Sequence, residues 1–227
     1  MYWEETKSQD TYQVPDDIVD LVFDISCRTL PVDHHHALSV AIASALPWFR
    51  GEELAGMHPV HVAESGNGWM RPENPADLLH LSRRTKLVLR VPGHRVDAAR
   101  ALSGRTLDVG GFELGVGDAT PRMLSEITTL FSRYVVANPD HDETEFLDDV
   151  VRQLAELDIR PRKMLPGRIK HIRTPEQQLT TRSLMVADLE REEAVRLQRR
   201  GLGPHRHLGC GIFIPHKDIN EVRDERH

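Results

Sequence analysis

The same order of expected elements, strand–helix–strand–strand–helix–strand, occurs twice along the 227 residues, and this repeat constrains the fold more than any other feature. In the first half, the patterns predict strands at 17–25, 58–62 and 85–91, a hairpin or bent strand around Gly110 and Gly111 at 105–116, and helices at 33–48 and 94–102. In the second half, they predict strands at 123–136, 162–172, 178–188 and 211–214, and helices at 142–157 and 190–200. This is the element order of the ferredoxin-like fold. We therefore predict an α+β protein with two tandem ferredoxin-like (RRM-like) βαββαβ units, at residues 15–120 and 121–217.

Local signals support the first unit. Asp33 precedes an apolar stripe with helical spacing and is therefore predicted to be the N-cap of the first helix. Residues 64–82 are rich in Gly, Pro, Asn and charge, which indicates a loop. The two halves share the order of their elements but no clear residue identity.

Charge is segregated along the chain. The net charge is −6, with 11 basic and 17 acidic residues in 1–120 and 18 of each in 121–227. Residues 140–158 hold eight acids, whereas 159–173 and 194–217 hold basic residues and no acid. Two basic tracts in an acidic protein indicate a defined track for a polyanion, although a solvated charged face is the alternative for either tract.

Several classes of protein are not expected. No apolar run reaches 18 residues, so no membrane partner is predicted, and the acidic start of the chain lacks a secretory pattern. Cys27 and Cys210 lie far apart without metal-type spacing, which favours two core residues in a reducing cytoplasm.

The segment 201–215 (GLGPHRHLGCGIFIP) is the most specific in the chain. Its four glycines permit positive φ and a close approach of the backbone, and the backbone N–H groups of such a loop bind phosphate. This segment follows a helix and precedes a strand, whereas a dinucleotide-binding fingerprint follows a strand and opens a helix. It also lacks the GK[ST] sequence of a P-loop. The alternative is a tight connection in which the glycines only solve packing.

Three consecutive histidines, His34, His35 and His36, open the first helix. Neighbouring helical residues point about 100° apart, so the three cannot converge on one metal ion, and no HExxH motif is present. His34 continues the apolar stripe and is expected near the surface at its end. The positive end of the helix dipole disfavours imidazolium there, as a general base requires. A cap or core-edge residue is the alternative.

Together, PVDH at 31–34 and the glycine-rich ending GCGIF at 209–213 resemble the CRISPR-associated repeat-processing endoribonucleases, the sixth Cas protein family of the RAMP superfamily. The likeness is greatest to a short subtype from myxobacterial-type systems and covers residues 15–215. The chain departs from this subtype at His35 and His36, where a small and an aromatic residue are expected. No tyrosine or lysine lies near the histidines in the sequence, although some members use them.

The resemblance implies an endoribonuclease that acts on CRISPR repeat RNA, with other CRISPR effector-complex proteins as further possible partners. In such enzymes the ribose 2′-OH attacks the adjacent phosphorus, so neither a metal nor another cofactor is implied. His34 is the expected general base, with His35 and His36 as alternatives. The expected RNA-binding residues are Arg160, Arg162, Lys163, Arg168, Lys170, Arg173, Gly201, Gly203, His205, Arg206, His207, Gly209 and Gly211. A non-catalytic RNA-binding protein of the same fold, and a metal hydrolase that uses the histidines, are the alternatives.

Overall fold

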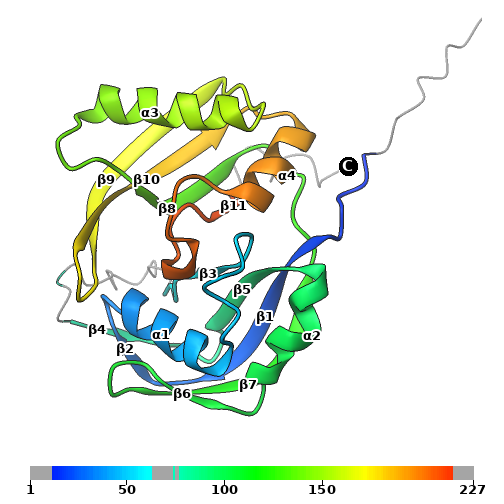
Figure 1. Cartoon of the computed structure of the whole chain (residues 1–227), viewed down its shortest axis with the longest axis vertical. Coiled ribbons are helices and arrows are strands. Elements are labelled where there is room, and N and C mark those ends of the chain that lie inside the picture. Colours follow the sequence, from blue (N-terminus) through cyan, green and yellow to red (C-terminus); the bar gives the residue numbers. More distant parts are fainter. Residues whose placement is uncertain (1–11, 63–73, 75–76, 217–227) are drawn as a thin grey trace, which may run out of the picture.

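The computed structural model describes residues 12–62, 74 and 77–216, which form antiparallel sheets of five, four and two strands with helices packed on the two larger ones (Figure 1). The N-terminal unit consists of β1 (Ile18–Ser26), α1 (His35–Ala45), β3 (Gly56–His58), β5 (Lys86–Pro92), α2 (Val96–Ala99) and β7 (Glu113–Arg122). The C-terminal unit consists of β8 (Leu130–Val136), α3 (Glu143–Glu156), β9 (Lys163–Arg173), β10 (Gln178–Ala187), α4 (Arg191–Arg200) and β11 (Phe213–Pro215).

Strand order identifies the fold of each unit. The sheets run β3-β5-β1-β7-β6 and β11-β8-β10-β9. In each, the first strand of the unit lies between the third and the fourth, and the second strand lies outside the third. The prediction of two tandem ferredoxin-like units is confirmed. The predicted division at residue 120/121 falls just before the end of β7 and stays a prediction.

Short elements supplement this frame. Strand β6 (Thr106–Asp108) forms the expected hairpin with β7 around Gly110 and Gly111, both of which have positive φ. Two 3-10 turns, η1 (Gly93–Arg95) and η2 (Arg100–Leu102), flank α2. Strand β2 (Thr29–Pro31) pairs with β4 (Leu78–His80). The loop predicted for 64–82 is thus wrong at its end, while 64–73 and 75–76 lie outside the described residues.

Two other predicted boundaries differ from those in the structure. Strand β8 begins at Leu130 rather than at residue 123. The backbone of Ser125 is instead held by the Gln198 side chain, whose Nε2 donates to Ser125 O at 2.6 Å and whose Oε1 accepts from Ser125 N at 3.1 Å. Helix α1 begins at His35 with His34 as its N-cap, so the prediction of Asp33 as the cap is wrong.

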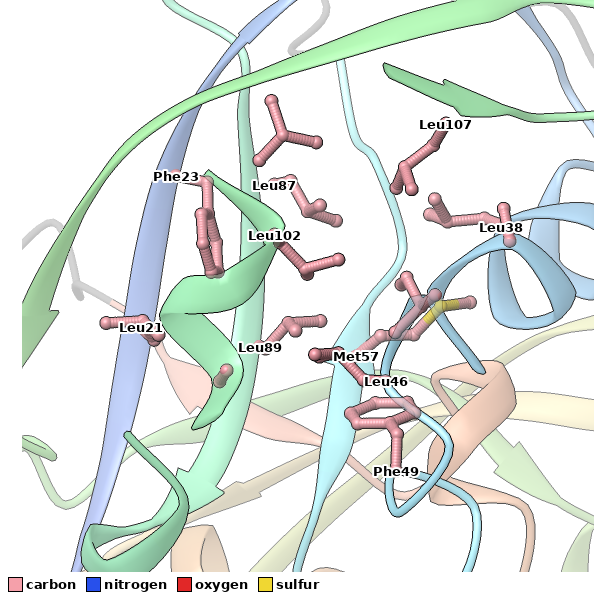
Figure 2. Packing of buried hydrophobic residues seen from close by; sticks show 14 of the residues in the cluster. Leu21, Phe23, Leu38, Leu46, Phe49, Met57, Leu87, Leu89, Leu102 and Leu107 are labelled. Carbon is pink, nitrogen blue, oxygen red and sulfur yellow. The ribbon is translucent and has the colours of Figure 1, made fainter. Parts of the chain in front are cut away.

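Each sheet packs on its own helices. In the N-terminal unit, Phe23, Leu87 and Leu89 of the sheet face Leu38 of α1 and Leu102, and Phe49 and Met57 close the same cluster (Figure 2). In the C-terminal unit, α3 begins with the capping box of Asp142 and Glu145, and its buried face packs on the sheet through Phe146, Val150 and Leu154. Cys210 is buried and Cys27 is half-buried, and both are free thiols. Among the described residues, no helix is both long enough and apolar enough to span a membrane.

A buried arginine connects the two units. Arg90 on β5 is fully buried, and its Nε and Nη2 donate to the two carboxylate oxygens of Asp20 on β1 at 2.8 and 3.1 Å. Its Nη1 donates across the interface to Gln198 O on α4 at 2.8 Å and to Phe213 O on β11 at 2.9 Å. Burial raises the pKa of Asp20, but Arg90 and then His58 outweigh it and hold that pKa well below its usual range. This arginine thus joins the N-terminal sheet to the last helix and strand.

Candidate active site

His34 is fully buried, so the expectation that it lies near the surface is wrong. Its Nδ1 donates to Pro31 O at 2.9 Å, and its Nε2 accepts the N–H of Val60 at 3.0 Å. Both ring nitrogens are therefore engaged in one neutral tautomer. The ring fastens the segment after β3 to the start of α1, which matches the alternative of a core-edge residue.

His35 is also buried, with 2% of its surface exposed, and it connects α1 to the glycine-rich segment. Its Nδ1 donates to Leu208 O at 2.9 Å, and its ring stacks on His34 with centroids 5.1 Å apart. The Tyr134 ring from β8 makes an edge-to-face contact with it, with centroids 4.5 Å apart, and Lys170 Nζ lies 5.2 Å from the centre of the Tyr134 ring. The structure thus brings a tyrosine and a lysine to the histidines from sequence positions about 100 and 136 residues away.

His36 is the one member of the triplet that is half-exposed. Burial raises the pKa of Asp33, against the smaller effects of Arg173 and His36. Burial, His205, Arg50 and His36 together lower the pKa of His207 on the glycine-rich segment. Helix α1 contacts both β9 and the 3-10 turn Arg206–Leu208 of the glycine-rich segment, and His36 lies in the first turn of this helix.

The glycine-rich loop (residues 201–211) depends on its glycines for both backbone conformation and space. Gly201, Gly203, Gly209 and Gly211 all have positive φ, between 66° and 87°, as expected. A Cβ at Gly211 would lie 1.9 Å from Leu202 O, and one at Gly209 would lie 2.5 Å from Pro59 Cγ. At Gly203 the nearest atom would be 3.6 Å away. A side chain at Gly209 or Gly211 would therefore clash with its neighbours. At Gly203 a side chain would have space, and only the positive φ favours glycine.

Arg206 points inward, in contrast to the expected phosphate contact. It is 8% exposed; its Nη1 donates to Arg200 O at 2.6 Å and its Nη2 to Leu54 O at 3.1 Å. Burial, with a smaller effect of Arg90, lowers its pKa to about 9. Its guanidinium caps the C-terminus of α4 and fixes the loop to the segment after α1. The expectation of a phosphate contact from this side chain does not fit its buried position.

The neighbouring side chains of the loop remain at the surface. His205 and His207 are half-buried, their rings 5.8 Å apart, and His205 itself has φ of 66°, which is uncommon for a residue with a Cβ. They line a cavity of 280 Å³ together with Arg50, Arg200, Glu52 and Glu53.

The basic tract lies on and just before β9, which forms the expected hairpin with β10. Arg162 and Lys163 pair with Glu190 and Asp188 at the surface, and Lys170 lies over Tyr134. Arg160, Arg168 and Arg173 are exposed. Their role in RNA binding stays a prediction. Within the described part of the chain, no group of three His, Cys, Asp or Glu side chains is arranged to hold a metal ion.

Solved structures of low sequence identity share this fold. A CRISPR-associated Cas6 protein aligns with a TM-score of 0.58 at 12% identity, over 88% of this chain and all of the other. A RAMP protein described as binding different RNA substrates aligns with a TM-score of 0.60 at 13% identity over the same shares. A Cas6-related protein from Pyrococcus furiosus gives 0.57 at 13% identity, over 88% of this chain and 99% of the other. The architecture is that of the RAMP-type proteins with two ferredoxin-like units.

Sequence comparison gives the family. The family model described as Cas6 Crispr matches residues 19–218, and the chain belongs to this family of CRISPR-associated proteins. The CRISPR-associated endonuclease Cas6 of Myxococcus xanthus (strain DK1622) is 28% identical over 197 residues, which are 87% of this chain and 81% of that protein. The resemblance drawn from PVDH and the glycine-rich ending is thereby confirmed.

Proposed function

We propose that this chain is an endoribonuclease that cuts CRISPR repeat RNA, by attack of a ribose 2′-OH on the adjacent phosphorus and without a metal ion. Family membership and the endonuclease named among its relatives support the activity. The observation that carries the proposed mechanism is the position of His36, a half-exposed imidazole beside a loop whose backbone is held in the positive-φ conformations typical of anion sites.

The proposed base is His36 rather than His34. A base must reach the proton that it removes, within about 3.2 Å or through one water. His34 is fully buried with both ring nitrogens engaged, and His35 is buried against Tyr134 and Leu208. In the proposed step His36 takes the proton of the 2′-OH, the 2′-oxygen forms a bond to phosphorus, and the bond to the 5′-oxygen breaks as that oxygen takes a proton from water. The products are a 2′,3′-cyclic phosphate and a 5′-hydroxyl.

The remaining groups would hold the scissile phosphate. Arg50, from the segment after α1, and His207 of the loop line one cavity, and Arg173 ends β9, which contacts α1. Such groups stabilise the extra negative charge of a pentacoordinate phosphorus. The β9–β10 hairpin, with its basic side chains, would bind the RNA beside this point.

The test is incubation of the protein with a transcript of its neighbouring array in EDTA. Cleavage once per repeat, with 2′,3′-cyclic phosphate ends, is the expected result. A 2′-deoxy nucleotide at the cut position should prevent cleavage, because it removes the nucleophile, while leaving binding intact. Binding without cleavage would support the non-catalytic RNA-binding alternative. Cleavage that EDTA abolishes and added divalent metal restores would support the metal hydrolase.

A further inference from the structure

The 5′-oxygen is the one reacting atom of the proposed cleavage to which no side chain has been assigned. An alkoxide leaves phosphorus slowly, because an alcohol has a pKa close to that of water, at about 16. A general acid that protonates the oxygen as the bond breaks removes this obstacle. His36 cannot fill this role, because it takes the proton of the 2′-OH in the same step. The attacking and leaving oxygens lie roughly in line, so the acid must approach phosphorus from the side opposite to the base.

His207 lies next to the contact that joins helix α1 to the glycine-rich loop. His35 Nδ1 donates to Leu208 O at 2.9 Å, and His36 and His207 are the chain neighbours of these two residues. Consecutive Cα atoms are about 3.8 Å apart, so the two side chains begin within reach of one phosphodiester. Both are partly exposed, and they come from different units of the protein. A phosphate bound at this contact would therefore have one imidazole from each unit.

The backbone of the loop holds His207 in one place. It is the middle residue of the 3-10 turn η3 (Arg206–Leu208), and the residues on either side of this turn, His205 and Gly209, have φ of 66° and 87°. The two backbone hydrogen bonds that close the turn, donated to His205 O and Arg206 O, are each 2.9 Å long. A proton donor that is held in place beforehand costs no reorganisation when charge develops on the substrate.

The surroundings of His207 favour the transfer of a proton. Burial lowers the pKa of His207, and His205, Arg50 and His36 lower it further. A protonated imidazole with a lowered pKa is a stronger acid, so it gives up its proton more readily. Arg50, Arg200 and His207 line the same cavity, whose cations attract the phosphate groups of RNA. A bound phosphate favours the protonated ring by its charge, so the acid is charged when the substrate is in place.

We infer that His207 is the general acid of this cleavage and that it acts together with His36 as the base. The protonated His207 ring donates its proton to the 5′-oxygen while the bond between that oxygen and phosphorus breaks, and water then returns a proton to His207. His36, which has taken the proton of the 2′-OH, releases it to water, so both rings regain their starting states. This inference rests on the proposed function, in which water is the source of that proton and His207 delivers it.

The test compares two repeat RNAs in single-turnover cleavage by the full chain in EDTA. They are identical except that sulfur replaces the 5′-oxygen at the cut position of the second RNA. A thiol has a pKa of about 8.5, so the sulfur leaves as a thiolate without a proton donor. His207→Gln is expected to slow cleavage of the all-oxygen RNA by about 100- to 10,000-fold, and that of the sulfur RNA by less than about threefold. The retained rate on the sulfur RNA shows that the variant is folded and binds RNA.

Two further variants separate the roles of the imidazoles. His36→Ala should slow cleavage of both RNAs by about the same factor, because sulfur in the leaving group does not replace the base. The matched control is His141→Gln, which removes an imidazole that pairs with Asp149 on α3. This control should cut both RNAs at the wild-type rate.

Normal cleavage of the all-oxygen RNA by His207→Gln would refute the inference. Equal losses on the two RNAs would refute it as well, and would assign His207 to RNA binding or to the fold. Rescue by sulfur in His205→Asn instead of His207→Gln would overturn the assignment of His207 in favour of the other ring of the loop. A wild type that cuts neither RNA would refute the proposed function and this inference with it. A wild type that cuts both RNAs while His207→Gln is unimpaired would refute the general acid alone.

Discussion

Replacement of Arg90 by methionine is expected to destabilise the protein more than any single change at its surface. Methionine has a similar length and no charge, so the substitution removes four hydrogen bonds with little change in volume. It leaves the Asp20 carboxylate buried without its bidentate partner, and it leaves Gln198 O and Phe213 O without their donor. Removal of one partner from a buried ion pair costs about 3 to 5 kcal/mol. The loss is thus a large part of a typical total stability of about 5 to 15 kcal/mol.

The matched control is Arg95→Met. Arg95 pairs with Glu52 at 2.9 Å and lies over Trp48, but its side chain is 37% exposed, and exposed ion pairs contribute about 0 to 1 kcal/mol. The measurement is urea unfolding followed by circular dichroism, with the unfolding free energy taken from the midpoint and slope. A loss for Arg90→Met below about 1.5 kcal/mol, or equal to that of Arg95→Met, would refute the view that the buried pair couples the two units.

The pH dependence of stability provides a second, independent test of the prediction for Arg90→Met. Burial lowers the pKa of His58, and Arg90 lowers it further against the opposing effect of Asp20. A folded-state pKa below the unfolded value penalises stability as pH falls, because the unfolded state then binds more protons. Removal of Arg90 raises the pKa of His58 toward its ordinary value and reduces that penalty. The deficit of Arg90→Met relative to the wild type is therefore expected to be smaller at about pH 5 than at about pH 8.

Three further predictions concern the site. His36→Ala is expected to slow single-turnover cleavage of repeat RNA by about 100- to 10,000-fold, with RNA affinity within about twofold of the wild type. The control Val40→Ala, on the same helix, should cut normally. Normal cleavage by His36→Ala would exclude His36 as the base. Gly211→Ala is expected to lower the thermal midpoint well beyond Gly203→Ala, because only the former places a Cβ against a backbone oxygen, and similar midpoints for both would contradict this packing. Loss of three basic side chains of β9 to alanine should reduce the salt dependence of RNA binding by about 0.7 to 0.9 for each phosphate contact removed, and an unchanged slope would assign them to a solvated face. The triple variant replaces Lys163, Arg168 and Lys170.

The sequence was sufficient wherever the signal is local. The helical spacing of the apolar residues predicts α3 to within a residue at each end. The β9–β10 hairpin was likewise predicted from two strand-like runs around Thr174. The glycines of the loop were correctly expected to take positive φ, since only glycine does so without strain.

The sequence alone was insufficient where contacts between segments far apart in the chain determine the local structure. Residues 123–129 resemble a strand, but the Gln198 side chain, far away in the chain, binds the backbone of Ser125. His34 has the pattern of an end residue, yet the N–H of Val60 completes its burial. Nothing in the order of residues distinguishes Arg90 or Asp20 from the many other charged residues, because their pairing depends on the register of β1 against β5.

The candidate site depends on the contact between the two units, because each unit contributes part of it. His36 belongs to α1 of the first unit, whereas the glycine-rich loop belongs to the second. The loop is nevertheless held by both, because Leu208 O accepts from His35 while Gly211 N donates to Tyr134 O at 2.7 Å. Neither unit alone therefore contains the arrangement of imidazole and loop on which cleavage would depend. Arg90 fixes the same contact through Gln198 O and Phe213 O, so loosening this contact should separate the base from the phosphate before either hydrophobic core is exposed.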